Sequence, residues 1–181
     1  MLLDTPICDF GWKAPDFTLC DPAGTTFTMR EQLGDKGLLI VFICNHCPYV
    51  LAIADRLADD TRDLMDEGIG VLAVMSNDYT RVPADSPENM VKFAAQFDFP
   101  FPYLVDEQQS VGKSYGAVCT PDFFGLNMDG ELHYRGRLDS AAMGDPKGRT
   151  REMVDAMRLI ARTGQGPRQQ TPSMGCSIKW R

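Results

Sequence analysis

The sequence lacks any block of basic residues. Its 18 Lys and Arg are outnumbered by 25 Asp and Glu, which gives a formal net charge of −7. Because a phosphate backbone is bound through clustered positive charge, we expect no nucleic-acid partner. The sequence also lacks a run of eighteen apolar residues, the length that a membrane-spanning helix needs, so we expect no membrane partner.

The N-terminus has no basic segment in front of an apolar stretch. Residues 1–6 contain one acid, Asp4, and no Lys or Arg, unlike a secretory signal. We therefore expect a cytoplasmic protein. In that reducing compartment the six Cys are expected to be free or catalytic thiols rather than a framework of structural disulfides.

No internal repeat and no second domain are evident in the 181 residues, a length that suits one domain. We expect a single domain over residues 1–181. Its core covers about residues 14–162, and residues 164–181 are expected to form an extended C-terminal tail rich in Gly, Gln and Pro.

What the sequence does contain is a C-x-x-C motif, Cys44-Asn45-His46-Cys47, followed directly by Pro48. The apolar run 37–43 before it predicts a strand buried on both faces, and residues 48–67 have helical spacing. At a helix N-terminus, free N–H groups and the helix dipole favour a thiolate, and a C-x-x-C thiol there can have a pKa between about 3.5 and 7.5 instead of roughly 8.5. Pro48 gives up an N–H that has no intrahelical partner.

The remaining segments alternate strands and helices. We expect a hairpin from 14–19 and 25–28, strands at 69–75, 101–105, 122–127 and 132–137, and helices at 86–97, 108–115 and 147–162, the first of them capped by Ser86. The strands 37–43 and 69–75, joined by a helix, form a β-α-β unit and should be parallel. This order predicts an α/β fold with a central mixed sheet flanked by helices.

The order of elements and four short motifs resemble the thioredoxin superfamily, in particular its peroxiredoxin-like branch (alkyl hydroperoxide reductase/thiol-specific antioxidant). The resemblance covers about residues 14–162. Its matching residues are Ala14-Pro15-Asp16-Phe17, the run from Phe42 to Pro48, Val118-Cys119-Thr120-Pro121 and Asp129-Gly130.

The resemblance implies a thioredoxin fold with an N-terminal hairpin extension, and thiol-disulfide oxidoreduction without a bound cofactor or metal. It makes Cys44 the exposed attacking thiol and Cys47 the buried resolving thiol. It also predicts a cis peptide bond before Pro121, with the backbone of Thr120 free to pair with a substrate strand. The implied partner is a protein disulfide or thiol, with a thioredoxin- or glutathione-type reductant.

The remaining motif residues are expected to support the two thiols. An imidazolium at His46 would stabilise the Cys44 thiolate. Two features depart from thioredoxin itself: Ile43 replaces the usual tryptophan, and the strand 38–43 holds no acid to accept the proton of Cys47.

A peroxidase is the main competing interpretation, with Cys47 or Cys44 as the thiol that reduces hydroperoxides. Peroxiredoxins carry Pro-x-x-x-Thr-x-x-Cys, and aligning their cysteine with Cys47 puts Cys44 at the Thr position and Ile40 at the Pro position. Arg135 or Arg137 is then the candidate for the guanidinium that orients the peroxide.

Two further interpretations use the same residues: a metal-binding site, and a binding module that has no catalytic activity. A zinc site needs four ligands, but there is no second C-x-x-C and His133 is the one histidine outside the motif. Copper-delivery relatives use a Cys pair spaced one residue wider together with a distant histidine. A binding module on a thioredoxin scaffold would use the groove at Thr120 and Pro121 without turnover.

The cysteines outside the motif have different expected roles. Cys119, two residues before Pro121, should lie near the site as a regulatory or a packed thiol. Cys176 could be brought back to the motif by the tail as a third redox thiol, with Trp180 as an anchor. Cys8 and Cys20 are expected to be bystanders.

Overall fold

The computed structural model describes all residues, 1–181, and its central strand is β4 (Leu38–Phe42). All five residues of β4 are fully buried. Leu39 and Val41 belong to the core on one face of the sheet, and the other three residues belong to the core on the opposite face. Since successive side chains of a strand point to opposite faces, burial on both sides explains why this run shows no apolar/polar alternation.

Seven strands form the main sheet, and β4 lies near its middle. Strand β4 pairs in parallel with β5 and β5 with β6, whereas every other pairing in this sheet is antiparallel. The predicted mixed sheet is therefore confirmed. The strand order is β3 (Thr26–Thr28), β2 (Thr18–Cys20), β6 (Tyr103–Val105), β5 (Gly70–Met75), β4, β8 (Asp122–Leu126) and β9 (Leu132–Tyr134).

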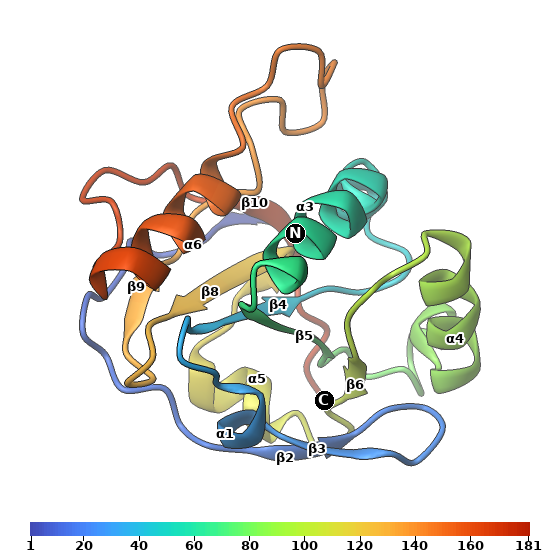
Figure 1. Cartoon of the computed structure of the whole chain (residues 1–181). Helices are drawn as coiled ribbons and strands as arrows, with labels where there is room; N and C mark the ends of the chain where they lie inside the picture. The colour runs from blue at the N-terminus through green and yellow to red at the C-terminus, as the bar shows by residue number, and fades with distance from the viewer.

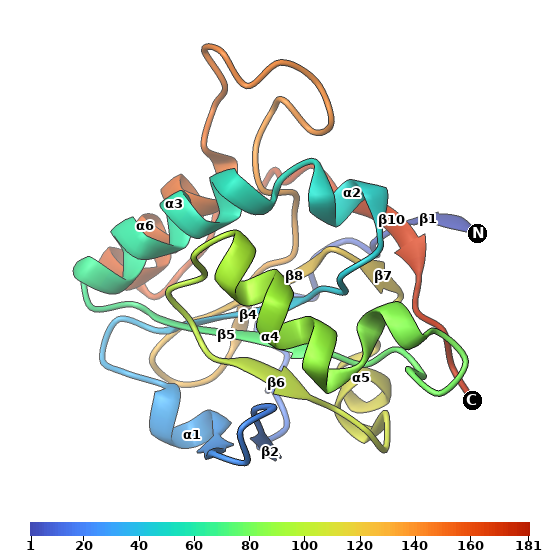
Figure 2. The same ribbon diagram turned by 90° about the vertical axis from the view of Figure 1, so that its right-hand side faces the viewer.

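Helices cover both faces of this sheet (Figures 1 and 2). One face carries α2 (Pro48–Leu51), α3 (Ala54–Asp66), α4 (Pro87–Gln96) and α6 (Glu152–Thr163). The opposite face carries α1 (Met29–Gln32) and α5 (Ser110–Tyr115). This arrangement is the expected thioredoxin fold. None of the helices has the length and apolar character needed to cross a membrane.

A second, three-stranded sheet was not predicted. It joins the two ends of the chain to the segment before Pro121, in the order β1 (Leu2–Asp4), β10 (Met174–Ser177), β7 (Cys119–Thr120). Both chain ends consequently lie at the same end of the molecule (Figure 2). The tail, residues 164–181, is extended as expected, but part of it is a strand paired on both edges.

The predicted helix over 48–67 is two helices. After α2, the N–H of Ile53 donates to the carbonyl of Val50, a tighter bond than that of an α-helix, and α3 begins at the next residue. Val50 and Ile53 both lie in the core. The break leaves only one short helical turn, α2, directly behind the C-x-x-C motif.

The residue directly before β4 must be a glycine. Gly37 has φ of +92°, and a Cβ there would lie 2.2 Å from the carbonyl oxygen of Leu126 on β8. Gly24 has nearly the same φ, +88°, but no atom within 4 Å of its Cβ position. The two positions therefore share the backbone strain and differ in the steric clash.

We predict that Gly24→Ala lowers the free energy of unfolding by about 1 kcal/mol and that Gly37→Ala lowers it by about 3 kcal/mol or more. The difference arises because the added methyl group at residue 37 must push β8 away from β4. Urea unfolding of both variants measures it, and equal losses would contradict the packing described.

Candidate active site

The C-x-x-C motif lies between the end of β4 and the start of α2. Cys47 is the residue that caps α2, and Pro48 is its first residue, as predicted. Cys44 and Cys47 have exposed fractions of 1% and 0%. The expectation that Cys44 is exposed is therefore wrong, because the neighbouring elements cover both cysteines. Both are free thiols in this structure.

Thr120 contacts both sulfurs of the motif. Its Oγ1 lies 3.2 Å from the Cys44 Sγ, and its carbonyl oxygen lies 3.1 Å from the Cys47 Sγ. The peptide bond from Thr120 to Pro121 is cis, as predicted, but the backbone of Thr120 is not free as expected, because β10 of the tail already pairs with it. The sequence thus brings Cys44, Cys47, Thr120 and Pro121 together although the two segments lie more than seventy residues apart.

The two thiols have pKa values shifted in opposite directions. A hydrogen bond from Cys44, together with donors from Cys176 and Val50, lowers the pKa of Cys47 to about 4 despite burial. The pKa of Cys44 is raised by that same hydrogen bond, by burial and by the charge of Asp85. The pair therefore loses one proton readily and keeps the second between the two sulfurs. The directions of these shifts favour the thiolate on Cys47, whereas the resemblance placed it on Cys44. In its protonated form Cys47 donates to the Thr120 carbonyl, and ionisation gives up that bond.

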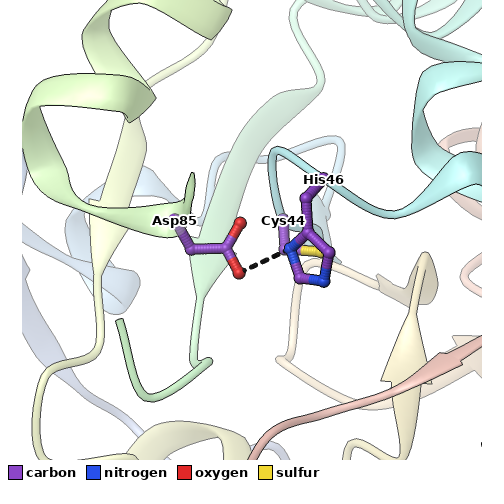
Figure 3. Close-up of side chains that lie close together, drawn as sticks. All are labelled: Cys44, His46 and Asp85. Carbon is purple, nitrogen blue, oxygen red and sulfur yellow. Dashed lines mark ion pairs between the residues drawn. The ribbon is translucent and has the colours of Figure 1, made fainter. Parts of the chain in front are cut away.

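His46 and Asp85 lie beside Cys44 (Figure 3). The His46 Nδ1 is 2.9 Å from an Asp85 carboxylate oxygen, but the ring N–H is not aligned with that oxygen, so this is an ion-pair contact without a well-formed hydrogen bond. His46 is partly exposed, and Asp85 is fully buried. His46 therefore faces a carboxylate next to the sulfur that it was expected to stabilise.

Hydrogen bonds from three sides hold this carboxylate and the motif in place. Asp85 accepts from the backbone N–H of Asn45 at 2.8 Å and from the side chain of Asn77 at 2.8 Å. Asn45 in turn accepts from the Tyr103 hydroxyl at 3.0 Å and donates to the carbonyl of Ala84 at 3.0 Å. Asn45 thus links the motif to Asp85, Tyr103 and Ala84.

Sequence reasoning missed Asp85, Asn77 and Tyr103. A signal was present: β4 and β5 are parallel neighbours, so the loop after β5 must open at the same edge as the motif. That loop contains Asn77 and ends with the short helical turn η1 (Pro83–Asp85). Polar side chains in it were therefore candidates for contact with Cys44.

Three potential metal ligands converge at this point. One ligand atom each from Cys44, His46 and Asp85 lies within 4.8 Å of the others. The set is one ligand short of a structural zinc site, and both Asp85 oxygens already accept hydrogen bonds. His133, the distant histidine that a copper site would need, lies on β9 beside Phe10 and does not join this group.

The two arginines suggested for a peroxide site are engaged elsewhere. Arg135 donates to Asp122 at 2.9 Å and to the carbonyl of Gly116 at 2.8 Å. Arg137 makes two bonds of 2.8 Å to the carboxylate of Glu152. Both guanidinium groups are thus paired with carboxylates, and neither makes a hydrogen bond to a sulfur of the motif.

A largely apolar pocket of about 320 Å³ lies beside Pro121, on the side of α2. Tyr49, Ile53 and Phe123 contribute to its walls, and Met174 of the tail lies at its edge. The pocket adjoins the segment that carries Thr120: Pro121 lines it, whereas Cys44 and Cys47 do not.

Comparison with known proteins identifies the family of the chain. The family model of the AhpC/TSA family matches residues 10–135. The chain belongs to the AhpC/TSA family.

Named relatives fall in two redox groups. The thiol-disulfide oxidoreductase ResA of Bacillus thuringiensis is 25% identical over 128 residues, which cover 68% of this chain and 67% of that protein. A Mycobacterium tuberculosis protein named "Putative peroxiredoxin Rv2521" is 24% identical over 122 residues, covering 67% and 73% of the two chains. The named relatives thus include a thiol-disulfide oxidoreductase and a putative peroxiredoxin.

Similarity over the full length is found with a solved structure. The crystal structure of an uncharacterized conserved protein from Geobacillus kaustophilus has a TM-score of 0.93 and 38% identity. The alignment covers 100% of this chain and 97% of the other, so it includes the tail and the second sheet.

We predict that the reduced protein holds one thiolate at about pH 6, where an ordinary thiol is protonated. Ultraviolet thiolate absorbance should fall as the pH drops through about 4, since Cys47 then takes up its proton. Cys44→Ala removes the main donor to Cys47 and should move this transition to higher pH. Cys20→Ser, at an exposed thiol, serves as the control. A protein without any thiolate below pH 7 would contradict the assignment.

We also predict that Asp85→Asn lowers the pKa of Cys44, because it removes a negative charge beside that sulfur. In a Cys47→Ala background, alkylation of Cys44 followed by mass spectrometry should shift to lower pH. Asp78→Asn, in the same loop, is the matched control, and an identical profile for the two aspartate variants would contradict the role of Asp85.

Proposed function

We propose that the protein is a thiol-disulfide oxidoreductase that exchanges disulfides through Cys44 and Cys47. The observation that carries the proposal is the pair of sulfurs that meet at Thr120, in surroundings that shift their two pKa values in opposite directions. A thiolate is the attacking species in disulfide exchange, and a neighbouring thiol is needed to release the product. The motif supplies both.

In the reductive direction, the covered Cys47 must first be exposed by movement of the neighbouring elements, and its thiolate then attacks one sulfur of a substrate disulfide. The bond between the two substrate sulfurs breaks, and the leaving sulfur takes the electron pair and a proton. Cys44 then loses its proton and attacks Cys47, so that the Cys44–Cys47 disulfide forms and the substrate leaves as a dithiol. The reverse sequence oxidises a substrate dithiol. No cofactor enters either direction.

The proposed substrate is a protein disulfide or dithiol, with a thioredoxin- or glutathione-type thiol restoring the starting state. Its support is the apolar pocket beside Pro121, which suits a side chain that flanks a substrate cysteine. The name of the Bacillus thuringiensis relative supports the same chemistry.

A peroxidase is the second candidate, because a thiolate at Cys47 is also what reduces a hydroperoxide. The peroxiredoxin-like relatives favour it. The engaged guanidinium groups of Arg135 and Arg137, and Cys44 at the position of the peroxiredoxin threonine, count against it.

We predict that a disulfide and hydrogen peroxide, each added at one equivalent, oxidise the protein at very different rates. A disulfide substrate should consume two thiols rapidly, and either Cys44→Ser or Cys47→Ser should lower disulfide turnover about 100-fold or more. Peroxide should react slowly with both variants and the wild type. Thiol counting measures both reactions, with Cys20→Ser as the control.

If peroxide rapidly oxidises Cys47 in the Cys44→Ser variant, the protein is a peroxidase and the proposed disulfide exchange is overturned. A wild-type protein that binds a protein disulfide without oxidising either thiol would instead be a binding module.

A further inference from the structure

Strand β10 of the tail lies along the strand that contacts both active-site sulfurs. It pairs antiparallel with β7, with Cys176 opposite Thr120 and Ser177 opposite Cys119. Side chains of directly opposed residues point to the same face of a sheet. The Thr120 hydroxyl points at Cys44, so the side chain of Cys176 lies on the face of β7 that carries the motif.

Contacts on both sides of β10 hold it in this register. Before the strand, the Ser173 hydroxyl donates to the carbonyl of Pro121 at 2.8 Å. After it, Lys179 donates its backbone N–H to Asn77 and accepts from the N–H of Asp78, each at 2.8 Å. The tail is therefore anchored to Pro121 and to the loop that also holds Asp85.

Gly175 makes the close approach of β10 possible. A Cβ at this position would lie 2.0 Å from the carbonyl oxygen of Thr120 and 2.5 Å from its carbonyl carbon. Any other residue at 175 would push the strand away from the segment that presents its carbonyl to Cys47.

Cys176 is in contact with Cys47. Its side chain packs against the core cluster that contains Cys44 and Cys47, and its thiol and backbone N–H lie close enough to the Cys47 sulfur to lower the pKa of that thiol. Helix α2 also packs against β10, and the two lie together in Figure 2. Cys119 differs: it precedes Thr120 on β7, so its side chain points to the opposite face, and its sulfur lies 3.6 Å from the carbonyl of Pro121.

We propose that Cys176 is a third redox thiol of this centre and that it exchanges with Cys47. The proposal rests on the disulfide chemistry proposed above for the C-x-x-C motif. The Cys176 thiolate attacks the Cys47 sulfur of the Cys44–Cys47 disulfide. A bond forms between Cys47 and Cys176, and the bond to Cys44 breaks. Cys44 leaves with the electron pair and takes up the proton that Cys176 released, so no outside oxidant is consumed.

The exchange also regulates access to the site. An extended substrate segment would gain backbone hydrogen bonds by pairing with an open strand edge, and β10 already occupies this edge of β7. A disulfide between Cys47 and Cys176 fastens the tail there and leaves Cys44 reduced. Reduction of that disulfide by a small thiol frees the tail and returns Cys47 to the pair.

The test uses the full chain with Cys44→Ser, reacted with one equivalent of oxidised glutathione, quenched in acid and mapped by peptide mass spectrometry. Cys47 should first form a mixed disulfide with glutathione, which Cys176 then displaces, so that Cys47–Cys176 is the main product. Adding Cys176→Ser should stop the reaction at the mixed disulfide. Adding Cys20→Ser instead should change nothing.

Gly175→Ala in the Cys44→Ser background tests the geometry. It should lower the yield of Cys47–Cys176 about tenfold or more, because the strand that carries Cys176 is displaced. Gly24→Ala, at a glycine with open surroundings, should leave the yield unchanged.

Two results overturn the proposal in distinguishable ways. A stable mixed disulfide at Cys47 with Cys176 still free to alkylate, while the wild type forms Cys44–Cys47, overturns the role of Cys176 alone. A wild type that forms no Cys44–Cys47 disulfide under the same treatment removes the proposed function and this inference with it.

Discussion

The site depends on the position of one residue, Thr120, relative to two segments that are distant in sequence. Its hydroxyl faces one sulfur of the motif, its carbonyl faces the other, and its backbone pairs with the tail. A strand as short as β7 has little stability alone. Its place is set by β8, which continues directly from Pro121 and pairs with β4 along five residues. The sheet core thus determines the spacing between Thr120 and the motif.

The groups around the two sulfurs shift the pKa values of the thiols. The buried carboxylate of Asp85 sits near Cys44, and the hydrogen-bond donors of Cys44 and Cys176 converge on Cys47. A negative charge beside one sulfur and donors around the other both place the first ionisation on Cys47. In the proposed function the pair acts as a unit, in which one sulfur attacks and the other holds the proton until it is needed.

The sequence predicted those parts of the structure that local patterns determine. The uniform apolar run before Cys44 predicted the central strand, and Ser86 was predicted to cap the helix that is now α4, which it does. The pairing of β1, β10 and β7 could not be predicted in this way, because strands of two to four residues show no periodicity and their partners are up to 174 residues apart. The break at Ile53 was missed for a related reason: it follows from the burial of Val50 and Ile53 in the folded core, and helical spacing continues through it.

The most direct test of this account is a redox titration of the wild-type protein in glutathione buffers of graded composition. Each sample is quenched in acid, alkylated and mapped by peptide mass spectrometry. The account predicts that Cys47 loses its alkylation in one reversible two-electron transition, with its partner found at Cys44 or Cys176. It would be contradicted if Cys47 stayed fully alkylated in the most oxidising buffer, or if it were recovered alone as a sulfinic acid.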